Sequence, residues 1–276
     1  TTTYTGQQRT KALSTWGVLA AAGAASGVLL GGVLTSYLSW EWIFFINVPI
    51  GLVTAMAATH FVPSSSGTVG SLRDLDFPGA VLLVIGLVSL VYAVEGIASD
   101  GWTSGRTIGF FALSLALLVG FALVERRSPR ALIPVRTWKI RSLVSSAWVM
   151  FAATGILVGT FFLNSLFLQQ ALDYSALQTG LAFLPLVAIT GVASHVGPKL
   201  LARYGSRVVV IGGSILIAAG QFYLSLVTSG ASYFTDLFPG FLVVGLGIGL
   251  TFVAVSVTAM ADVTDSTAGL ASGLMT

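Results

Sequence analysis

Long, uninterrupted runs of apolar residues dominate this chain, and short polar segments separate them. A helix that crosses a bilayer core of about 30 Å needs about 20 mostly apolar residues. The strands of a membrane barrel would instead show segments of about ten residues with alternating polarity, and these runs do not alternate. The pattern therefore predicts an all-α, polytopic transmembrane helix bundle with about eight spans. The predicted spans are Thr15–Tyr37, Trp42–Val62, Phe77–Ala98, Thr107–Val124, Leu143–Leu172, Thr179–Leu201, Val208–Val227 and Phe234–Met260.

The basic residues favour one side of these spans. Twelve of the 13 lysines and arginines lie in the segments on one side, and only Arg106 lies on the other. Cytoplasmic loops carry such an excess, so we expect both ends of this segment to be cytoplasmic and the spans to cross the cell (inner or plasma) membrane. The same placement explains the net charge of +3 without a nucleic-acid partner. The twelve residues are Arg9, Lys11, Arg73, Arg126, Arg127, Arg130, Arg136, Lys139, Arg141, Lys199, Arg203 and Arg207.

The composition excludes several classes of protein. Only 8% of the residues are charged, whereas soluble domains carry about 25%, so a soluble surface of the usual kind cannot be built. The chain has no cysteine, which excludes disulfides, thiolate metal sites and cysteine nucleophiles. The polar opening, Thr1–Lys11, lacks the charged-then-apolar build of a signal peptide, and we expect the chain to begin inside a longer protein.

Three ionisable residues lie inside the predicted spans: His60, Glu95 and His195. Glu95 stands about 18 residues into its span, about 27 Å from the cytoplasmic end, whereas both histidines stand near cytoplasmic ends. The three side chains therefore cannot meet as an acid–base group. No cluster has metal-ligand spacing, and no glycine loop followed by lysine could hold a phosphate. We expect no enzyme activity, no metal and no cofactor.

Glycines recur at four-residue spacing in the first span, at Gly23, Gly27 and Gly31, and Gly32 follows the last of them. Positions four apart share a helix face, and glycine there lets another backbone approach closely. A second distinctive segment, Trp40–Gly51, reads W-E-W-I-F-F-I-N-V-P-I-G. Together the two segments resemble the fifth and sixth helices of drug:proton antiporters in the major facilitator superfamily, in its fourteen-helix branch.

The four glycines occupy the glycine positions of that family's antiporter motif, G-x-x-x-G-P-x-x-G-G, whereas Val28 stands at its proline. The resemblance implies that this glycine seam is a tight helix interface that restricts leak. We expect bulky replacement of Gly27 or Gly31 to abolish export.

The resemblance covers the whole chain and implies three parts. Residues 1–62 close the N-terminal transporter half with two spans, residues 63–142 are an inserted helix pair with cytoplasmic linkers, and residues 143–276 begin the C-terminal half with four spans. On this comparison the chain corresponds to helices five to twelve of fourteen. Four further helices are expected before it and two after it.

Gly197–Arg207 resembles a second copy of the family's short cytoplasmic clamp, in which a tight glycine turn joins two helices and paired charges hold one conformation. Arg203, Gly205 and Arg207 fit that motif, and Ala202 stands at its acidic position. The resemblance therefore implies a retained turn without the charge pair.

The function implied is proton-coupled export of small amphipathic or cationic organic molecules such as drugs, antiseptics or secondary metabolites. The partners would be a small-molecule substrate, protons and the lipid bilayer, with the protein a monomer. Two alternatives remain open: a nutrient importer of the same fold, and a non-transporting scaffold or truncated, inactive membrane protein.

The fifth predicted span offers a polar centre among aromatic residues. Uncharged amides beside aromatic rings suit a bulky, partly apolar or cationic substrate, although the same residues could serve helix packing and lipid contact. The candidate pocket residues are Asn164, Gln169, Gln170, Phe161 and Phe162, with Gln221 on the seventh span as a weaker candidate. Glu95 is the candidate for proton coupling, because intramembrane ionisable residues are often functional; an interfacial role is the alternative.

Overall fold

The computed structural model describes residues 25–61, 76–127, 137–228 and 230–260, together with Gly23 and Gly273. Every element in the described part of the chain is helical. The helices are Ala25–Tyr37, α2 (Trp42–Phe45), α3 (Asn47–Phe61), α4 (Phe77–Asp100), α5 (Gly105–Arg127), the 3-10 turn η2 (Thr137–Lys139), α6 (Arg141–Gln170), α7 (Ala176–Tyr204), α8 (Ser206–Ser225), the π-helical turn η3 (Tyr233–Leu237) and α9 (Phe238–Ala259).

Six helical stretches of the described chain are long and apolar enough to cross a membrane. The longest, Ala176–Ser225, consists of α7 and α8, which meet at Gly205. The Ala25–Tyr37 helix is apolar but shorter, and residues 15–22 of its predicted span lie outside the described part. These helices confirm the predicted all-α polytopic bundle. Several sequence assignments also fall outside the described residues, namely Thr1–Lys11, Arg73, Arg130 and Arg136.

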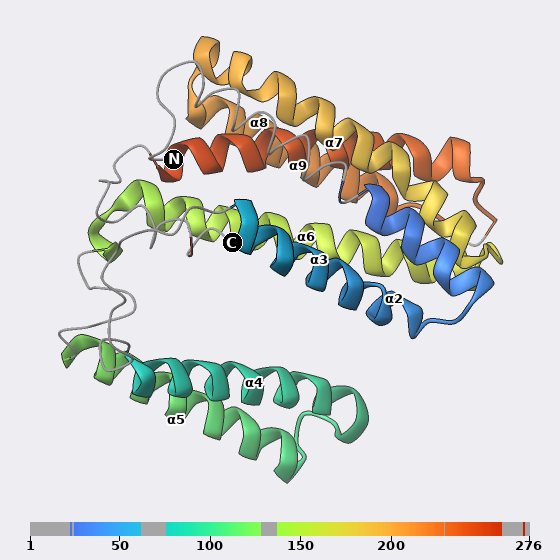
Figure 1. The fold of residues 1–276 in the computed structure, drawn as a ribbon. Coiled ribbons are helices and arrows are strands. Elements are labelled where there is room, and N and C mark those ends of the chain that lie inside the picture. Colours follow the sequence, from blue (N-terminus) through green and yellow to red (C-terminus); the bar gives the residue numbers. More distant parts are fainter. Residues whose placement is uncertain are drawn as a thin grey trace. The chain divides into compact units, whose positions relative to one another are not determined.

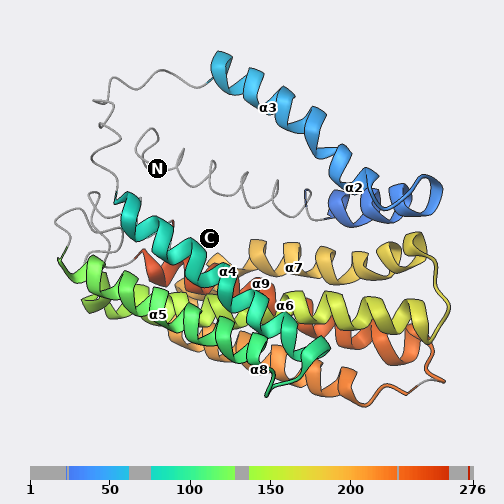
Figure 2. The same ribbon diagram turned by 90° about the horizontal axis from the view of Figure 1, so that it is seen from below.

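The chain forms two compact units, one of Thr1–Pro63 with Ser145–Thr276 and one of Ser64–Val144. In the second unit α4 and α5 run antiparallel as a helical hairpin (Figures 1 and 2). The α4 face that meets α5 buries only small residues, namely Gly79, Gly86, Ser89, Ala93 and Gly96. Small side chains let the two helices approach closely, and α5 side chains fill the space beside them: a Cβ added to Gly86 would lie 3.0 Å from the Leu118 side chain.

Local sequence determines both ends of α4. The carboxylate of Asp76 accepts a hydrogen bond of 3.0 Å from the Gly79 backbone N–H, which caps the helix. Gly101 ends the helix with a φ of 82°, in the region that favours glycine.

In the first unit α9 packs against both α7 and α8 (Figure 1). Glycines on α9 make this possible on two sides. A Cβ added to Gly245 would lie 2.5 Å from the Leu186 carbonyl oxygen of α7, whereas one added to Gly247 would lie 2.7 Å from the Gly213 carbonyl oxygen of α8. Residues two apart point to nearly opposite sides of a helix, so alternating glycines open both faces of α9 to close packing.

Aromatic rings fill the centre of this unit. Phe183 of α7 stacks on Phe241 of α9 with ring centroids 5.3 Å apart, and Phe161 of α6 lies 4.7 Å from Phe183. The Tyr233 hydroxyl donates to the Ala182 carbonyl oxygen at 2.7 Å, which ties the start of the last span to α7. The aromatic part of the core is therefore shared by α6, α7 and α9, and Ile217 of α8 belongs to the same buried cluster.

Candidate functional site

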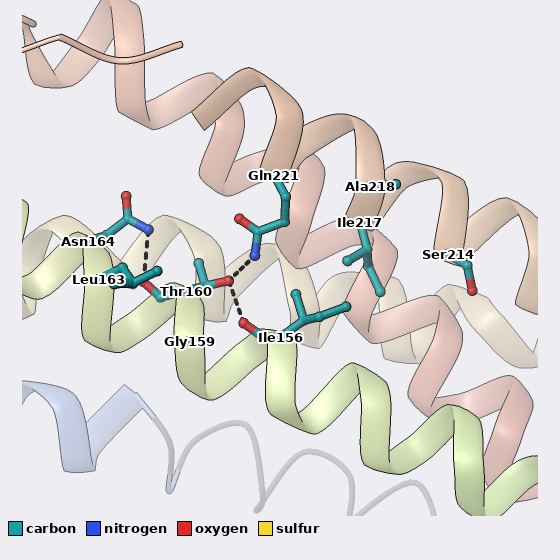
Figure 3. A pocket seen from close by; sticks show the side chains of 9 residues that line it. All are labelled: Ile156, Gly159, Thr160, Leu163, Asn164, Ser214, Ile217, Ala218 and Gln221. Carbon is teal, nitrogen blue, oxygen red and sulfur yellow. Dashed lines mark hydrogen bonds between the residues drawn. The ribbon is translucent and has the colours of Figure 1, made fainter. Parts of the chain in front are cut away.

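A cavity of about 450 Å³ lies between α6 and α8 (Figure 3). Its volume is in the range typical of small-molecule sites, about 300–1,000 Å³. The residues that line it are Ile156, Gly159, Thr160, Leu163 and Asn164 from α6, and Ser214, Ile217, Ala218 and Gln221 from α8. The lining is mostly apolar, with a few polar groups from both helices.

Hydrogen bonds connect these polar groups to one another. The Thr160 hydroxyl donates to the Ile156 carbonyl oxygen at 2.7 Å, and the Gln221 side-chain amide donates to the Thr160 hydroxyl oxygen. The Asn164 side-chain amide donates to the Thr160 carbonyl oxygen at 2.8 Å. Thr160 is therefore the centre of a small polar network that joins α6 to α8 (Figure 3).

The structure separates the predicted pocket residues. Of the five, only Asn164 lines the cavity. Gln169 is exposed and donates to the Ser165 hydroxyl of its own helix at 2.8 Å, and Gln170 is also exposed. Phe162 is 63% exposed, whereas Phe161 packs into the aromatic core. Gln221, the weaker candidate, does line the cavity.

Thr160 was missed by the sequence reasoning, although it is one of the most deeply buried polar residues of the described chain, at 2% exposure. One signal could have found it. Thr160 and Asn164 are four residues apart and so share a helix face.

The glycine seam makes its contact through its last member. A Cβ added to Gly32 would lie 2.9 Å from the Ala176 carbonyl oxygen and 3.0 Å from the Leu177 Cα, both at the start of α7. Gly180 of α7 makes the matching close contact from the other side, because a Cβ added there would lie 2.9 Å from the Val28 carbonyl oxygen. The Ala25–Tyr37 helix and α7 thus meet backbone to backbone, without intervening side chains.

A polar contact supports this glycine pair. The Ser36 hydroxyl oxygen accepts a hydrogen bond of 3.0 Å from the Leu177 backbone N–H. The first N–H groups of a helix have no partner within the helix, and Ser36 supplies one to α7. Ser175 and Gln178 complete the cap as a capping box.

The other seam glycines have open space beside them in the described chain. A Cβ added to Gly23, Gly27 or Gly31 would meet nothing within 4 Å. The close contact expected of the whole motif is therefore observed at Gly32.

The candidate for proton coupling, Glu95, is exposed on α4. Its helix ends near an ion pair of 3.0 Å between Arg106 and Asp100, and the Arg106 guanidinium lies 4.6 Å from the centre of the Tyr92 ring. Among the described residues, no group of three histidine, cysteine, aspartate or glutamate side chains could hold a metal ion.

The clamp residues surround the turn between α7 and α8. Gly205 has a φ of 79° and a ψ of 160°, and its N–H donates to the Leu201 carbonyl oxygen at 2.9 Å. The Arg203 guanidinium lies 5.3 Å from the centre of the Tyr204 ring, and Arg207 is exposed. The described structure has the tight glycine turn that the motif predicts.

Among the described residues outside the spans, one carboxyl group, that of Glu41, has a shifted pKa. A hydrogen bond from the Ser39 side chain lowers the pKa of Glu41 below its ordinary value, and a hydrogen bond from the backbone of Glu41 adds to this effect. Glu41 precedes α2, in the short segment between two apolar helices.

The whole chain, residues 1–276, matches the family model described as "Major Facilitator Superfamily". It is 35% identical over 271 residues to the puromycin resistance protein pur8 of Streptomyces alboniger, which covers 97% of this chain and 53% of that protein. The cephamycin export protein CmcT of Amycolatopsis lactamdurans is 34% identical over 273 residues, covering 98% of this chain and 56% of CmcT. The MFS-type transporter EfpA of Mycobacterium tuberculosis is 32% identical over 264 residues, covering 95% and 49%. The chain spans about half the length of these curated relatives.

Proposed function

We propose that this chain, which belongs to the major facilitator superfamily, forms the middle part of an exporter of small amphipathic organic molecules. Its apolar helices and its family make it a multi-pass membrane protein. One of its relatives is named a puromycin resistance protein and another a cephamycin export protein. Both names favour export over nutrient uptake. Protons moving inward would drive the export, and the protein would act as a monomer in the cell membrane, with both ends of this segment cytoplasmic.

The contact between the Ala25–Tyr37 helix and α7 is the observation that carries this proposal. The first of these helices belongs to the proposed N-terminal half and α7 to the proposed C-terminal half. Secondary transporters of this kind alternate by rocking one half against the other around a fixed site. A backbone-to-backbone contact at Gly32 and Gly180 would seal one end of the substrate path while the halves move.

The remaining assignments follow from the same scheme. The unit of Ser64–Val144 would be the inserted helix pair with its linkers, since its small-residue hairpin is compact by itself. Glu95 on that hairpin remains our candidate for proton coupling. Its exposed carboxylate could exchange protons with water at the interface.

Ethidium accumulation in everted membrane vesicles tests the proposal, with the protein produced as its gene encodes it. We expect a pH gradient, acid inside, to drive ethidium into vesicles that contain the protein, and a protonophore to abolish the uptake. Uptake equal to that of vesicles without the protein would refute an exporter.

The seam is tested in the same vesicles. Gly32→Val and Gly180→Val should each reduce ethidium uptake about tenfold, because overpacking a close contact costs about 1–3 kcal/mol. Gly31→Val is the matched control. The antiporter motif led us to expect loss of export at this position, but a Cβ added to Gly31 would meet nothing within 4 Å among the described residues, so we now expect uptake close to that of the unmodified protein. Equal loss in Gly31→Val, with all variants present in the membrane, would contradict a contact made by Gly32.

A further inference from the structure

The hydrogen bonds around Thr160 determine how two amide groups are oriented. The Thr160 carbonyl oxygen can only accept, so the Asn164 side chain must turn its nitrogen toward it. The Thr160 hydroxyl gives its hydrogen to the Ile156 carbonyl, and its oxygen therefore accepts from the Gln221 nitrogen. The orientation of the Asn164 amide follows from the carbonyl acceptor alone, whereas that of the Gln221 amide follows from the Thr160 hydroxyl hydrogen lying on the Ile156 carbonyl.

This arrangement leaves hydrogen-bond acceptors for a guest. With the nitrogens committed to Thr160, the carbonyl oxygens of Asn164 and Gln221 are on the sides of their amides away from it (Figure 3). Within the described residues neither oxygen accepts a protein hydrogen bond. The Ser214 hydroxyl lies on the same cavity wall as Gln221.

The rest of the lining restricts the guest further. Among the described residues, no charged and no aromatic side chain lines the cavity, and apolar residues such as Ile156, Leu163 and Ile217 make up most of its wall. The contact that a guest makes with the wall would therefore be mostly apolar. Its specific recognition would come from hydrogen bonds to amide oxygens, because ion pairs and ring stacking are not offered.

We propose that the cavity between α6 and α8 binds amphipathic molecules that carry hydrogen-bond donors, such as aromatic amines or hydroxyl groups, through the side-chain oxygens of Asn164 and Gln221. This inference deepens the proposed export function and rests on it for its physiological meaning. It also narrows the substrate class, since lipophilic ions without N–H or O–H groups gain nothing from the two oxygens.

Two organic cations of equal charge test this selectivity. Ethidium carries two aromatic amino groups, whereas tetraphenylphosphonium has no hydrogen-bond donor. Binding of each is measured to the purified protein, produced as its gene encodes it and embedded in lipid nanodiscs. Ethidium is followed by fluorescence polarisation and radiolabelled tetraphenylphosphonium by equilibrium dialysis.

Gln221→Leu and Asn164→Leu remove the acceptors one at a time. We expect each to raise the Kd of ethidium about tenfold, as the loss of one well-formed hydrogen bond to a cationic guest would, and to leave the Kd of tetraphenylphosphonium unchanged. Gln169→Leu is the control, because Gln169 lies on the same helix but bonds only to Ser165. The ratio of the two Kd values does not depend on the fraction of folded protein, so a partly misfolded preparation still gives an answer.

Three results would overturn the inference. They are an unchanged ethidium Kd in both variants, an equal rise for both cations, and failure of the unmodified protein to bind ethidium. An equal rise would mean that the amides only hold α6 and α8 together. Binding is measured here without transport, so loss of ethidium uptake in vesicles with intact selective binding would refute the exporter and leave the site standing.

Discussion

The hydroxyl oxygen of Thr190 on α7 lies 3.0 Å from the carbonyl oxygen of Gly245 on α9. It also lies 2.8 Å from the carbonyl oxygen of Leu186 in its own helix, so one hydroxyl hydrogen serves two acceptors. The absent side chain of Gly245 is what allows this approach, since a Cβ there would lie 3.1 Å from the Thr190 hydroxyl oxygen. The hydrogen bond and the glycine packing therefore depend on each other.

Replacing Thr190 by valine should lower the thermal stability of the protein. Thr190→Val keeps the side-chain shape and removes the interhelical hydrogen bond, which is worth about 0.6 kcal/mol on average in membrane proteins. Thr258→Val is the control, because the Thr258 hydroxyl bonds only to Ala254 of its own helix. Melting temperatures in detergent, followed by fluorescence-detected size-exclusion chromatography, should fall more for Thr190→Val than for the control.

A single methyl group on the α7-facing side of α9 should be more harmful. In Gly249→Ala the new Cβ would lie 2.5 Å from the Thr190 carbonyl oxygen and 2.6 Å from the Ala193 Cβ. Overpacking of this kind costs about 1–3 kcal/mol. Gly155→Ala on α6 meets open space and should stabilise slightly, since alanine is the better helix former. Equal melting temperatures for the two variants would show that α7 and α9 are not packed as described.

The turn at Gly205 should tolerate neither alanine nor asparagine. With φ at 79° and ψ at 160°, it occupies a region that is essentially restricted to glycine and costs other residues about 1–3 kcal/mol. Asparagine tolerates the left-handed helical region, at ψ of about +30° to +60°, which is a different one. We expect the yield of monodisperse Gly205→Asn to be as low as that of Gly205→Ala, and a normal yield for Gly212→Ala. Rescue by asparagine would indicate a left-handed helical turn instead.

Single cysteines should report opposite sides of the membrane at the two ends of α7. This chain has no cysteine of its own, so Asp173→Cys and Arg207→Cys can be labelled individually. A membrane-impermeant maleimide added to intact cells should label Asp173→Cys and should reach Arg207→Cys only after permeabilisation. Labelling of both in intact cells would reverse the proposed orientation or disprove the span.

Ser39→Ala should raise the pKa of Glu41, because the hydrogen bond from Ser39 is the main cause of its lowered value. A carboxyl group whose folded pKa is lowered contributes stability above its unfolded pKa, and this contribution is lost as the pH falls through the folded pKa. The variant should therefore lose part of that acid-range pH dependence. Carbon-13 NMR titration of labelled glutamate, with Glu41→Gln for assignment, measures the shift; an unchanged pKa would contradict the hydrogen bond.

The helices themselves could be predicted from the sequence because each depends on a pattern of residues that are close together in the chain. Runs of apolar residues gave the spans, and the end of α7 is marked by Gly205 in a motif that already implied a turn. Ser175 and Gln178 likewise form a capping box from residues three apart. Such features need only neighbouring residues.

The glycine contact could be predicted only in part. The motif identified Gly32 among four equivalent glycines, but its partner Gly180 lies on a helix far along the chain. Which motif glycine meets a neighbour depends on how two helices cross, and a four-residue repeat does not encode that crossing.

The polar cavity shows the same limit. Asn164, Gln169 and Gln170 look equivalent as amides near one end of α6, yet the direction of each side chain around the helix decides its role. Asn164 lines the cavity between α6 and α8, whereas Gln169 donates a hydrogen bond to Ser165 of its own helix. Thr160, which connects α6 and α8, is a small polar residue in an apolar run, and only its four-residue spacing from Asn164 distinguishes it in the sequence.

The alternating glycines of α9 also limit how this region can move. With carbonyl oxygens of α7 and α8 pressed against its bare backbone, α9 has no flexible side chains there that could absorb a displacement by changing rotamer. Sliding it by a fraction of an ångström against either neighbour would bring main-chain atoms into overlap. We therefore expect the three helices to move together as one block, with changes of shape at its edges, such as the short contact that Gly32 makes with α7.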